Sequence, residues 1–345
     1  MSSTGKYIYG VINTGSHAAA PLLLGLNGVY TVPHGDVSAI VNDSEILDYA
    51  NLPADAAARC LVRHQLVIER IMHEFSIIPM RLGTYVLNEG EVMQVLTSGY
   101  RVFQDIFGMI ENRIEIDVAA SWTDMNAVIK EISEEEEVRA LKQSLLDKKE
   151  GITVDDQMKM GSLIESHMDR KKDECVHTIR DSLKGLGRNT KEYAPNNDAG
   201  ILNAAFLIDN GRRISFEEKL DELSNGFGGR VHFKCIGPLP PYSFYVLEVI
   251  KFRYEEIDQA RKKLGLNEFE TKDEIKRAHR RCASAYHPDR QFGLQSDAGK
   301  AEAEMEYDEI AKAYKLLSIF CQQESCSMKE EDFAGNSIIV RIREQ

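Results

Sequence analysis

The sequence predicts an α+β protein in which two α+β domains are followed by a helical hairpin and a C-terminal β-strand. Three observations support this prediction. Short β-rich runs alternate with helix-length apolar stripes up to about residue 250, the chain then becomes almost entirely helical, and a proline-rich corner separates the two parts. A length of 345 residues is enough for about two or three domains.

The corner lies within residues 230–249, where Gly237-Pro238-Leu239-Pro240-Pro241-Tyr242 is flanked by two β-rich runs. Proline fixes φ, lacks an amide donor and disfavours helix at the residue before it. We therefore expect a rigid, extended corner between two strands that form the last strand pair of the second domain. An ordinary edge-strand turn is the alternative on local chemistry alone.

The first domain is predicted to cover residues 1–150, with a sheet covered mainly on one face. Its last helix carries the acidic run Glu134–Glu137, which we interpret as a solvated helix face in preference to a docking surface. The expected elements are strands at 6–13, 28–32 and 37–42, a helix from Pro53 with the stripe Leu61, His64, Ile68, Ile71, Met72 and Phe75, a strand at 77–86, a helix at 88–112, a strand at 113–122 and a helix at 123–149.

The second domain is predicted to cover residues 151–250 and to be a smaller, ferredoxin-like α+β unit. Between its first helix and its first strand we expect a polar loop at 185–198. The other expected elements are a long helix at 154–184 with Met158, Leu163, Met168, Cys175, Ile179 and Leu183 on its apolar positions, a buried strand at 200–209, a short helix at 216–223 and the strands of the corner.

Composition excludes several classes of protein. A net charge of −13 argues against a nucleic-acid binder, because neutralising phosphates needs a basic surface. The six cysteines are scattered and form no disulfide framework, which indicates a reducing compartment. No apolar run approaches the roughly 20 residues of a membrane span, and the first residues have no signal-peptide core. We therefore expect a cytoplasmic protein without a membrane span.

Six short motifs, each weakly specific alone, occur in order along the first 250 residues. They are Lys6–Ile12, Gly35–Val41, Arg63-His64, Pro79-Met80-Arg81-Leu82-Gly83-Thr84, Asn112-Arg113-Ile114-Glu115 and the corner. The ordered set resembles the gas vesicle protein F/L family, GvpL/GvpF. The chain departs from it at Leu82, where an aromatic residue is expected, and at Leu239, where tryptophan is expected. The motif residues singled out are Pro79, Arg81, Gly83, Thr84, Arg113, Gly237, Pro238, Pro240, Pro241 and Tyr242.

The resemblance implies a two-domain α+β body with a modified ferredoxin-like second domain. It implies no enzymatic activity and no cofactor. Members of this family are accessory or minor proteins in building gas-filled protein shells. The resemblance therefore implies that the partners are the gas vesicle shell protein and other gas vesicle accessory proteins.

Residues 251–320 are predicted as a helical module. Its first helix, at 254–266, ends at Gly265, and its second begins at Thr271 with Glu274 in a capping box. The inward stripe of the second helix is expected to be Ile275, Ala278, Cys282 and Tyr286, and that of the third helix Tyr307, Ile310, Tyr314 and Leu317.

The turn between the second and third helices carries His287-Pro288-Asp289, and the second helix exposes a basic face. This arrangement resembles the J-domain of Hsp40 co-chaperones, in which the basic face and the tripeptide contact Hsp70 and stimulate its ATPase. The remaining matching residues are Leu264-Gly265-Leu266, Ile275, Ala278, Tyr286, Ile310, Ala313-Tyr314 and Leu317. The contacts that the resemblance implies are Lys276, Arg277, Arg280, Arg281, His287, Pro288 and Asp289.

The module departs from a J-domain at its end, where a mixed polar stretch at 320–333 replaces the fourth helix. A hairpin that only packs or recruits shell proteins is therefore the alternative to an Hsp70 contact. The tail at 321–345 contains Ser337–Arg343, a β-rich run that we expect to return to a sheet edge of the body, because an exposed terminal strand invites aggregation.

Residues able to bind metals or perform catalysis form no recognisable pattern. Cys321 and Cys326 lack a second ligand pair, which favours free thiols over a metal site. The leading hypothesis is a non-enzymatic assembly protein of gas vesicles that can bring Hsp70 to the assembly site. The alternatives are a general Hsp40-type co-chaperone and an enzyme with an interdomain cleft that uses Arg81, Arg113 and Glu115.

Overall fold

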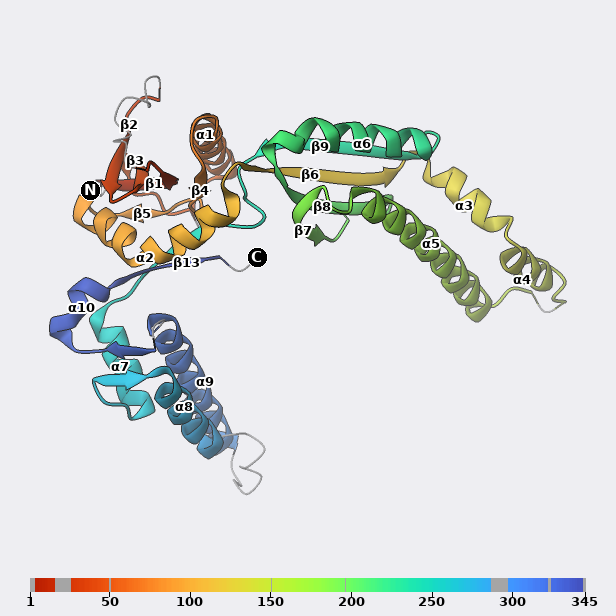
Figure 1. Ribbon diagram of the computed structural model, residues 1–345. Coiled ribbons are helices and arrows are strands. Elements are labelled where there is room, and N and C mark those ends of the chain that lie inside the picture. Colours follow the sequence, from red (N-terminus) through yellow and green to blue (C-terminus); the bar gives the residue numbers. More distant parts are fainter. Residues whose placement is uncertain are drawn as a thin grey trace. The chain divides into compact units, whose positions relative to one another are not determined.

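The computed structural model describes residues 4–15, 26–49, 51–149, 151–195, 197–286, 297–321 and 324–343 (Figure 1). Contacts divide the chain into two compact units. The first contains residues 1–67, 80–105 and 247–344, and the second contains residues 68–79 and 106–246. The four predicted domain ranges are not tested by this division and stay predictions.

The first unit contains an antiparallel sheet in which β3 (Val37–Glu45) lies between β2 (Val29–His34) and β1 (Thr4–Asn13). These strands are apolar and β-branched, and side chains on both faces of β1 and β3 are buried. Asp36, in the turn before β3, accepts hydrogen bonds from Tyr100 (2.8 Å) and Gln104 of α2 (Glu89–Ile110). The helix is thereby attached to the β2–β3 hairpin.

The predicted single strand at 77–86 is wrong, because the chain turns within it. It is divided into β4 (Ile77–Pro79) and β5 (Tyr85–Val86), and β5 pairs with β1. Gly83 lies between them at φ 84°, a left-handed conformation that glycine adopts without strain. A β-branched, apolar composition predicted strand here, but the turn at this glycine overrides it.

Helix α1 (Ala54–Met72) begins directly after Pro53, as predicted. Its predicted stripe is correct at His64, Ile68 and Ile71, which are buried, and wrong at Leu61, which is 42% exposed. Leu61 lies on the same side of the helix as Ile68, two turns nearer the N-terminus. Periodicity identifies the inward side of a helix but not how far along that side a neighbour covers it.

The second unit contains a four-stranded antiparallel sheet in the order β7-β8-β6-β9 (Gly187–Tyr193, Gly200–Asp209, Arg113–Trp122, Val231–Leu239). Thus β6, which the sequence placed in the range 1–150, pairs within the second unit. Two helices complete this unit, α5 (Val154–Leu183) and α6 (Arg213–Gly226), and a short 3₁₀ helix (Asn210–Arg212) precedes α6. Ile179 of α5 and Phe216 of α6 belong to an apolar core with Ile116, Val118 and Phe206 of the sheet.

The predicted loop at 185–198 and the predicted burial of Met158 are both wrong. The expected loop at 185–198 contains the edge strand β7, whose sequence GRNTKEY has no apolar alternation because the strand is largely exposed. Met158, expected on the buried side of α5, is 66% exposed. Segment β7 is a strand because its backbone forms hydrogen bonds with β8. Amino-acid composition does not predict such a pairing.

The predicted helix at 123–149 is two helices, α3 (Met125–Ser133) and α4 (Glu136–Leu146), which are separated within the acidic run. Glu135 and Glu137 lie 2.6 and 3.0 Å from the two ring nitrogens of the buried His167 on α5. The acidic run is therefore not simply a solvated face: two of its glutamates attach α4 to α5.

Only the first half of the corner is extended, because residues 237–239 belong to β9 and the chain turns from Pro241 onward. The strands that flank the corner do not pair with each other. Strand β9 pairs with β6, whereas β10 (Leu247–Lys251) forms a two-stranded antiparallel sheet with β13 (Ile338–Ile342). The prediction of a last strand pair is thus wrong, and the C-terminal run returns to β10. Each strand finds a partner distant in sequence, which no local pattern specifies.

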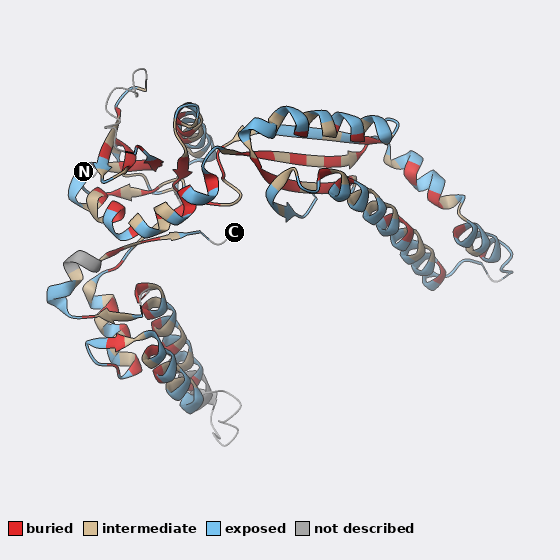
Figure 2. Cartoon of the chain, in the orientation of Figure 1, coloured by how far each residue is buried: buried red, intermediate tan, exposed pale blue. Residues whose placement is uncertain are grey.

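The helical module consists of α7 (Tyr254–Leu264), α8 (Lys272–Tyr286) and α9 (Asp297–Phe320) around an apolar core that includes Ile275, Ala278, Ile310 and Leu317 (Figure 2). Tyr286, expected to face inward, is 40% exposed. The stretch after α9 contains β12 (Ser325–Ser327), which pairs with β11 (Phe269–Thr271), and the short helix α10 (Glu330–Asn336). None of the described helices is long and apolar enough to cross a membrane.

Candidate functional site

The motif residues of the first unit meet at His64, a side chain of α1 that is 3% exposed. Its Nδ1 lies 2.7 Å from the Tyr7 hydroxyl and its Nε2 lies 3.1 Å from the carbonyl oxygen of Met80. Because a carbonyl only accepts, Nε2 carries the proton and Nδ1 accepts from Tyr7. Burial lowers the pKa of His64 to about 4, so the ring is neutral at neutral pH. This histidine is a hydrogen-bonded core residue.

The residues from Pro79 to Thr84 form a turn with its own hydrogen bonds. The Thr84 hydroxyl donates to the carbonyl oxygen of Arg81 at 2.6 Å, and a Cβ added at Gly83 would lie 2.9 Å from the Tyr49 ring. The Arg81 guanidinium lies 2.6 Å from Glu248 on β10, whose other carboxylate oxygen lies 3.0 Å from Arg341 on β13. These motif residues therefore attach the β10–β13 sheet to the rest of the first unit.

The motif residues of the second unit surround Glu115, which is 1% exposed. Its carboxylate accepts the backbone N–H of Ser243 at 2.8 Å, which holds the chain after the corner against β6. Burial raises the pKa of Glu115 to about 8, although the hydrogen bonds from Ser243 oppose the shift. Its neighbour Arg113 lies 3.3 Å from Asp209, so both of these ionisable motif residues have a partner within the second unit.

The corner itself approaches β6 closely. The peptide bond between Gly237 and Pro238 is cis, and a Cβ added at Gly237 would lie 3.0 Å from the carbonyl oxygen of Glu115. Pro240 and Pro241 are buried, and the N–H of Tyr242 donates to the carbonyl oxygen of Pro240 at 2.6 Å. These motif residues serve packing and chain direction.

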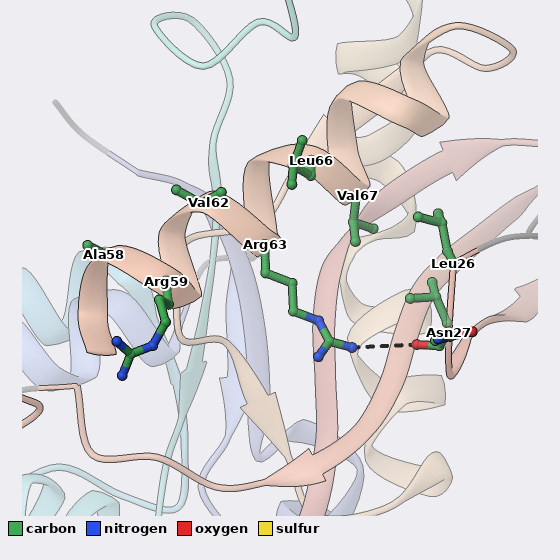
Figure 3. Close-up of a pocket in the computed structure, with 9 residues that line it drawn as sticks. Leu26, Asn27, Ala58, Arg59, Val62, Arg63, Leu66 and Val67 are labelled. Atoms are coloured by element: carbon green, nitrogen blue, oxygen red, sulfur yellow. Dashed lines mark hydrogen bonds between the residues drawn. The ribbon is translucent and has the colours of Figure 1, made fainter. Parts of the chain in front are cut away.

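A groove of about 540 Å³ lies between α1 and the chain leading into β2 (Figure 3). Val62 and Leu66 stand on α1 at 53% and 58% exposure, while Val29 and Val67 are buried beneath. Arg63 donates to the carbonyl oxygen of Asn27 at 3.5 Å. The lining residues are Leu26, Asn27, Val29, Ala58, Arg59, Val62, Arg63, Leu66 and Val67. The described residues that line the groove are thus largely apolar, with two arginines and no acidic side chain among them.

Sequence reasoning missed this groove, although a signal for it was present. Ala58, Val62 and Leu66 recur every four residues on α1, beside the buried stripe that contains His64 and Ile68. One helix therefore carries two apolar sides, of which a single neighbouring sheet covers one.

Four of the seven predicted Hsp70 contacts lie on α8. The side chains of Lys276, Arg277, Arg280 and Arg281 are all exposed, as predicted. Thr271 and Glu274 form the expected capping box, in which the Thr271 N–H donates to the Glu274 carboxylate at 2.8 Å and the Glu274 N–H donates to the Thr271 hydroxyl at 3.3 Å. His279 stacks on Tyr314 of α9 with ring centroids 4.1 Å apart. The remaining predicted contacts, His287, Pro288 and Asp289, lie outside the described residues.

Comparison with known families agrees with this geometry. The model of the gas vesicle synthesis protein GvpL/GvpF family matches residues 5–246. The chain belongs to the GvpL/GvpF family. A model of the DnaJ domain matches residues 262–321, which contain α8 and α9. Both predicted resemblances are therefore confirmed.

Individual relatives of this GvpL/GvpF member cover most of the first 250 residues. Gas vesicle protein F of Nostoc sp. is 26% identical over 192 residues, which are 55% of this chain and 78% of that protein. The protein of the same name from Streptomyces sp. is 23% identical over 245 residues, 69% of this chain and 98% of that one. The crystal structure of GvpF from Anabaena sp. PCC7120 superposes with a TM-score of 0.61 at 24% identity, covering 70% of this chain and 98% of that chain, and shows a shared fold.

The helical module has relatives of its own. The chaperone protein DnaJ of Clostridium beijerinckii is 49% identical over 55 residues, which are 16% of this chain and 13% of that protein. The likeness thus concerns one domain of a much longer chaperone. A gas vesicle body and a J-domain are joined in one chain.

Proposed function

We propose that this protein is a non-enzymatic accessory protein of gas vesicle assembly that recruits an Hsp70 through its J-domain. The supporting observation is the presence of a GvpL/GvpF match over residues 5–246 and a DnaJ match over residues 262–321 in one chain. The body binds the gas vesicle shell protein or other accessory proteins, and the site of action is the gas vesicle in the cytoplasm.

The physical logic is that apolar shell subunits aggregate before they are incorporated. A protein that holds such a subunit and delivers Hsp70 to it would keep it available for assembly. The proposed Hsp70 contacts are the exposed Lys276, Arg277, Arg280 and Arg281, together with His287-Pro288-Asp289.

The alternative of an enzyme that uses Arg81, Arg113 and Glu115 has less support than the accessory role. Arg81, Arg113 and Glu115 have their partners in Glu248, Asp209 and the N–H of Ser243. Such residues position backbone and strands, whereas catalytic groups face a substrate.

The Hsp70 contact is tested by measuring the steady-state ATPase of a purified Hsp70 with and without the full-length protein. We expect stimulation by the wild type and its loss in His287→Gln, with Lys262→Gln on the exposed side of α7 as the control. An inert wild-type protein would make the module structural.

The assembly role is tested separately by deleting the gene. Fewer or misshapen vesicles are expected, and vesicles of normal number and shape would contradict the proposal. Binding of the purified protein to unrelated denatured proteins, with no preference for the shell protein, would instead support a general Hsp40-type co-chaperone.

A further inference from the structure

The groove beside α1 has the length and the apolar character of a helix-binding surface. Ala58, Val62 and Leu66 extend over two helical turns, or about 12 Å, and Ala58 is small enough to let a partner backbone approach. Val62 and Leu66 are more than half exposed, although large apolar side chains at such spacing usually face a neighbour. An amphipathic helix that docks in a groove presents anchors at the same spacing.

The charge of the groove restricts the chemistry of that partner. Arg59 and Arg63 lie one turn apart on α1, and none of the described lining residues carries a carboxylate. This is notable on a chain with a net charge of −13. Arg59 lies 2.8 Å from Asp55, but both side chains are at least 70% exposed, and an exposed ion pair of this kind is weak. Its guanidinium is thus available to a carboxylate of a partner, which it can bind with two parallel hydrogen bonds.

We propose that the groove between α1 and the chain leading into β2 docks an amphipathic helix that combines apolar anchors with a neighbouring acidic side chain. The anchors fill the space between Val62, Leu66 and Leu26, and the carboxylate pairs with Arg59. Arg63 has a positioning role, because it also contacts the Asn27 carbonyl oxygen. This proposal rests on the proposed function, because an accessory role in assembly implies a protein partner. Its test involves neither vesicles nor Hsp70, so the docking proposal and the proposed function can fail separately.

The test uses the full-length protein and a fluorescein-labelled, alanine-based helical peptide of about 15 residues. The peptide carries two leucines four residues apart and a glutamate beside them. Two matched peptides replace that glutamate by glutamine or lysine. Fluorescence anisotropy should show the wild-type protein binding the glutamate peptide about tenfold more tightly than the glutamine peptide, as expected for a charge-assisted pair.

Variants separate the two components of binding. Leu66→Asp should weaken binding of the glutamate peptide at least about tenfold, and Arg59→Glu should reverse the preference toward the lysine peptide. Leu87→Asp and Arg101→Glu change exposed residues of the same unit outside the groove and should leave binding unchanged. Arg59→Glu alters an exposed side chain and should not disturb folding. The proposal can therefore be tested with this variant even if Leu66→Asp loses binding because it misfolds.

Three results would overturn the proposal. They are equal affinity of the wild type for the glutamate and glutamine peptides, unchanged binding in Leu66→Asp, and a preference for the glutamate peptide that survives Arg59→Glu. A concentration-dependent dimer that Leu66→Asp abolishes in analytical ultracentrifugation would overturn it too, because the occupant would then be a second copy of this chain.

Discussion

Helices α1 and α8 are both amphipathic and both bury one side, but they differ in what the other side presents. The outer side of α1 carries Val62 and Leu66, which are more than half exposed, beside a groove. The outer side of α8 carries Lys276, Arg277, Arg280 and Arg281, all exposed. The buried side of α1 packs against a sheet and that of α8 packs against other helices. Such packing explains the buried sides but not what the two outer sides present.

The difference indicates two kinds of recognition within one chain. An apolar groove recognises shape and depends on removing surface from water, whereas a basic helix face attracts an acidic partner over a longer range. The buried sides differ as well. That of α1 contains a hydrogen-bonded histidine, and that of α8 is apolar at Ile275 and Ala278. Each difference can be tested.

The largest expected effect concerns the buried side of α1. His64→Ala leaves the Tyr7 hydroxyl and the Met80 carbonyl oxygen without this partner and should cost about 3 kcal/mol of stability. Leu66→Ala, on the outer side of the same helix, should change stability by less than about 0.5 kcal/mol. Hydrogen exchange of the α1 amides measures both. Similar losses in the two variants would mean that α1 has no distinct buried and outer sides.

The second effect is the pH dependence that the buried His64 gives to the stability of the first unit. The pKa of His64 is about 4 in the folded protein, below the usual 6.5, so between these values the unfolded chain binds a proton that the folded chain does not. Stability should therefore fall by about 3 kcal/mol as the pH falls from about 6.5 to 4. Hydrogen exchange of the α1 amides as a function of pH measures this loss, and His64→Gln should flatten it. An equal slope in that variant would assign the loss to another group.

The third effect separates the two outer sides. Reversing two charges on α8 with Arg280→Glu and Arg281→Glu should reduce stimulation of Hsp70 ATPase at least about tenfold, because an acidic partner is then repelled. Leu66→Asp should leave that stimulation unchanged. If both changes reduce it, the groove and the helix belong to one binding surface.

The smallest effect is the response to salt. Raising NaCl from about 50 to 500 mM shortens the screening length several-fold and should weaken Hsp70 stimulation several-fold. Binding of a purely apolar helical peptide to the groove, measured by anisotropy, should change less than about twofold. A steep loss of that peptide's binding with salt would show that burial of apolar surface does not dominate recognition in the groove.

Several features of the fold were predictable because they depend on neighbours in sequence. Gly265 ends α7 in a left-handed conformation at φ 64°, and Thr271 with Glu274 begins α8. The exposed basic face of α8 follows from helical spacing. The ordered motifs likewise predicted the family, which the match over residues 5–246 confirms.

Features that depend on distant partners were not predictable. Strand β7 has a polar sequence and exists because β8 binds it, and β10 pairs with β13 instead of β9. The break between α3 and α4 occurs where Glu135 reaches His167 on another helix. Composition predicted a loop at β7 and one unbroken helix over α3 and α4. It predicted strands at β10 and β13 and the return of the C-terminal run to a sheet edge, but not that these two strands pair with each other.

The sequence by itself determined the family, the end of α7, the start of α8 and the basic face of α8, because caps and periodicity act over a few residues. Only the tertiary structure decided how far along α1 the buried side extends, that His64 is a neutral core residue and that Glu115 holds the chain after the corner. The physical reason is that burial and hydrogen bonding across sheets join residues far apart in the chain. The groove lined by Val62, Leu66 and Arg59 shows this most clearly. Its apolar residues can be recognised in the sequence, but whether other parts of the fold cover them depends on tertiary packing.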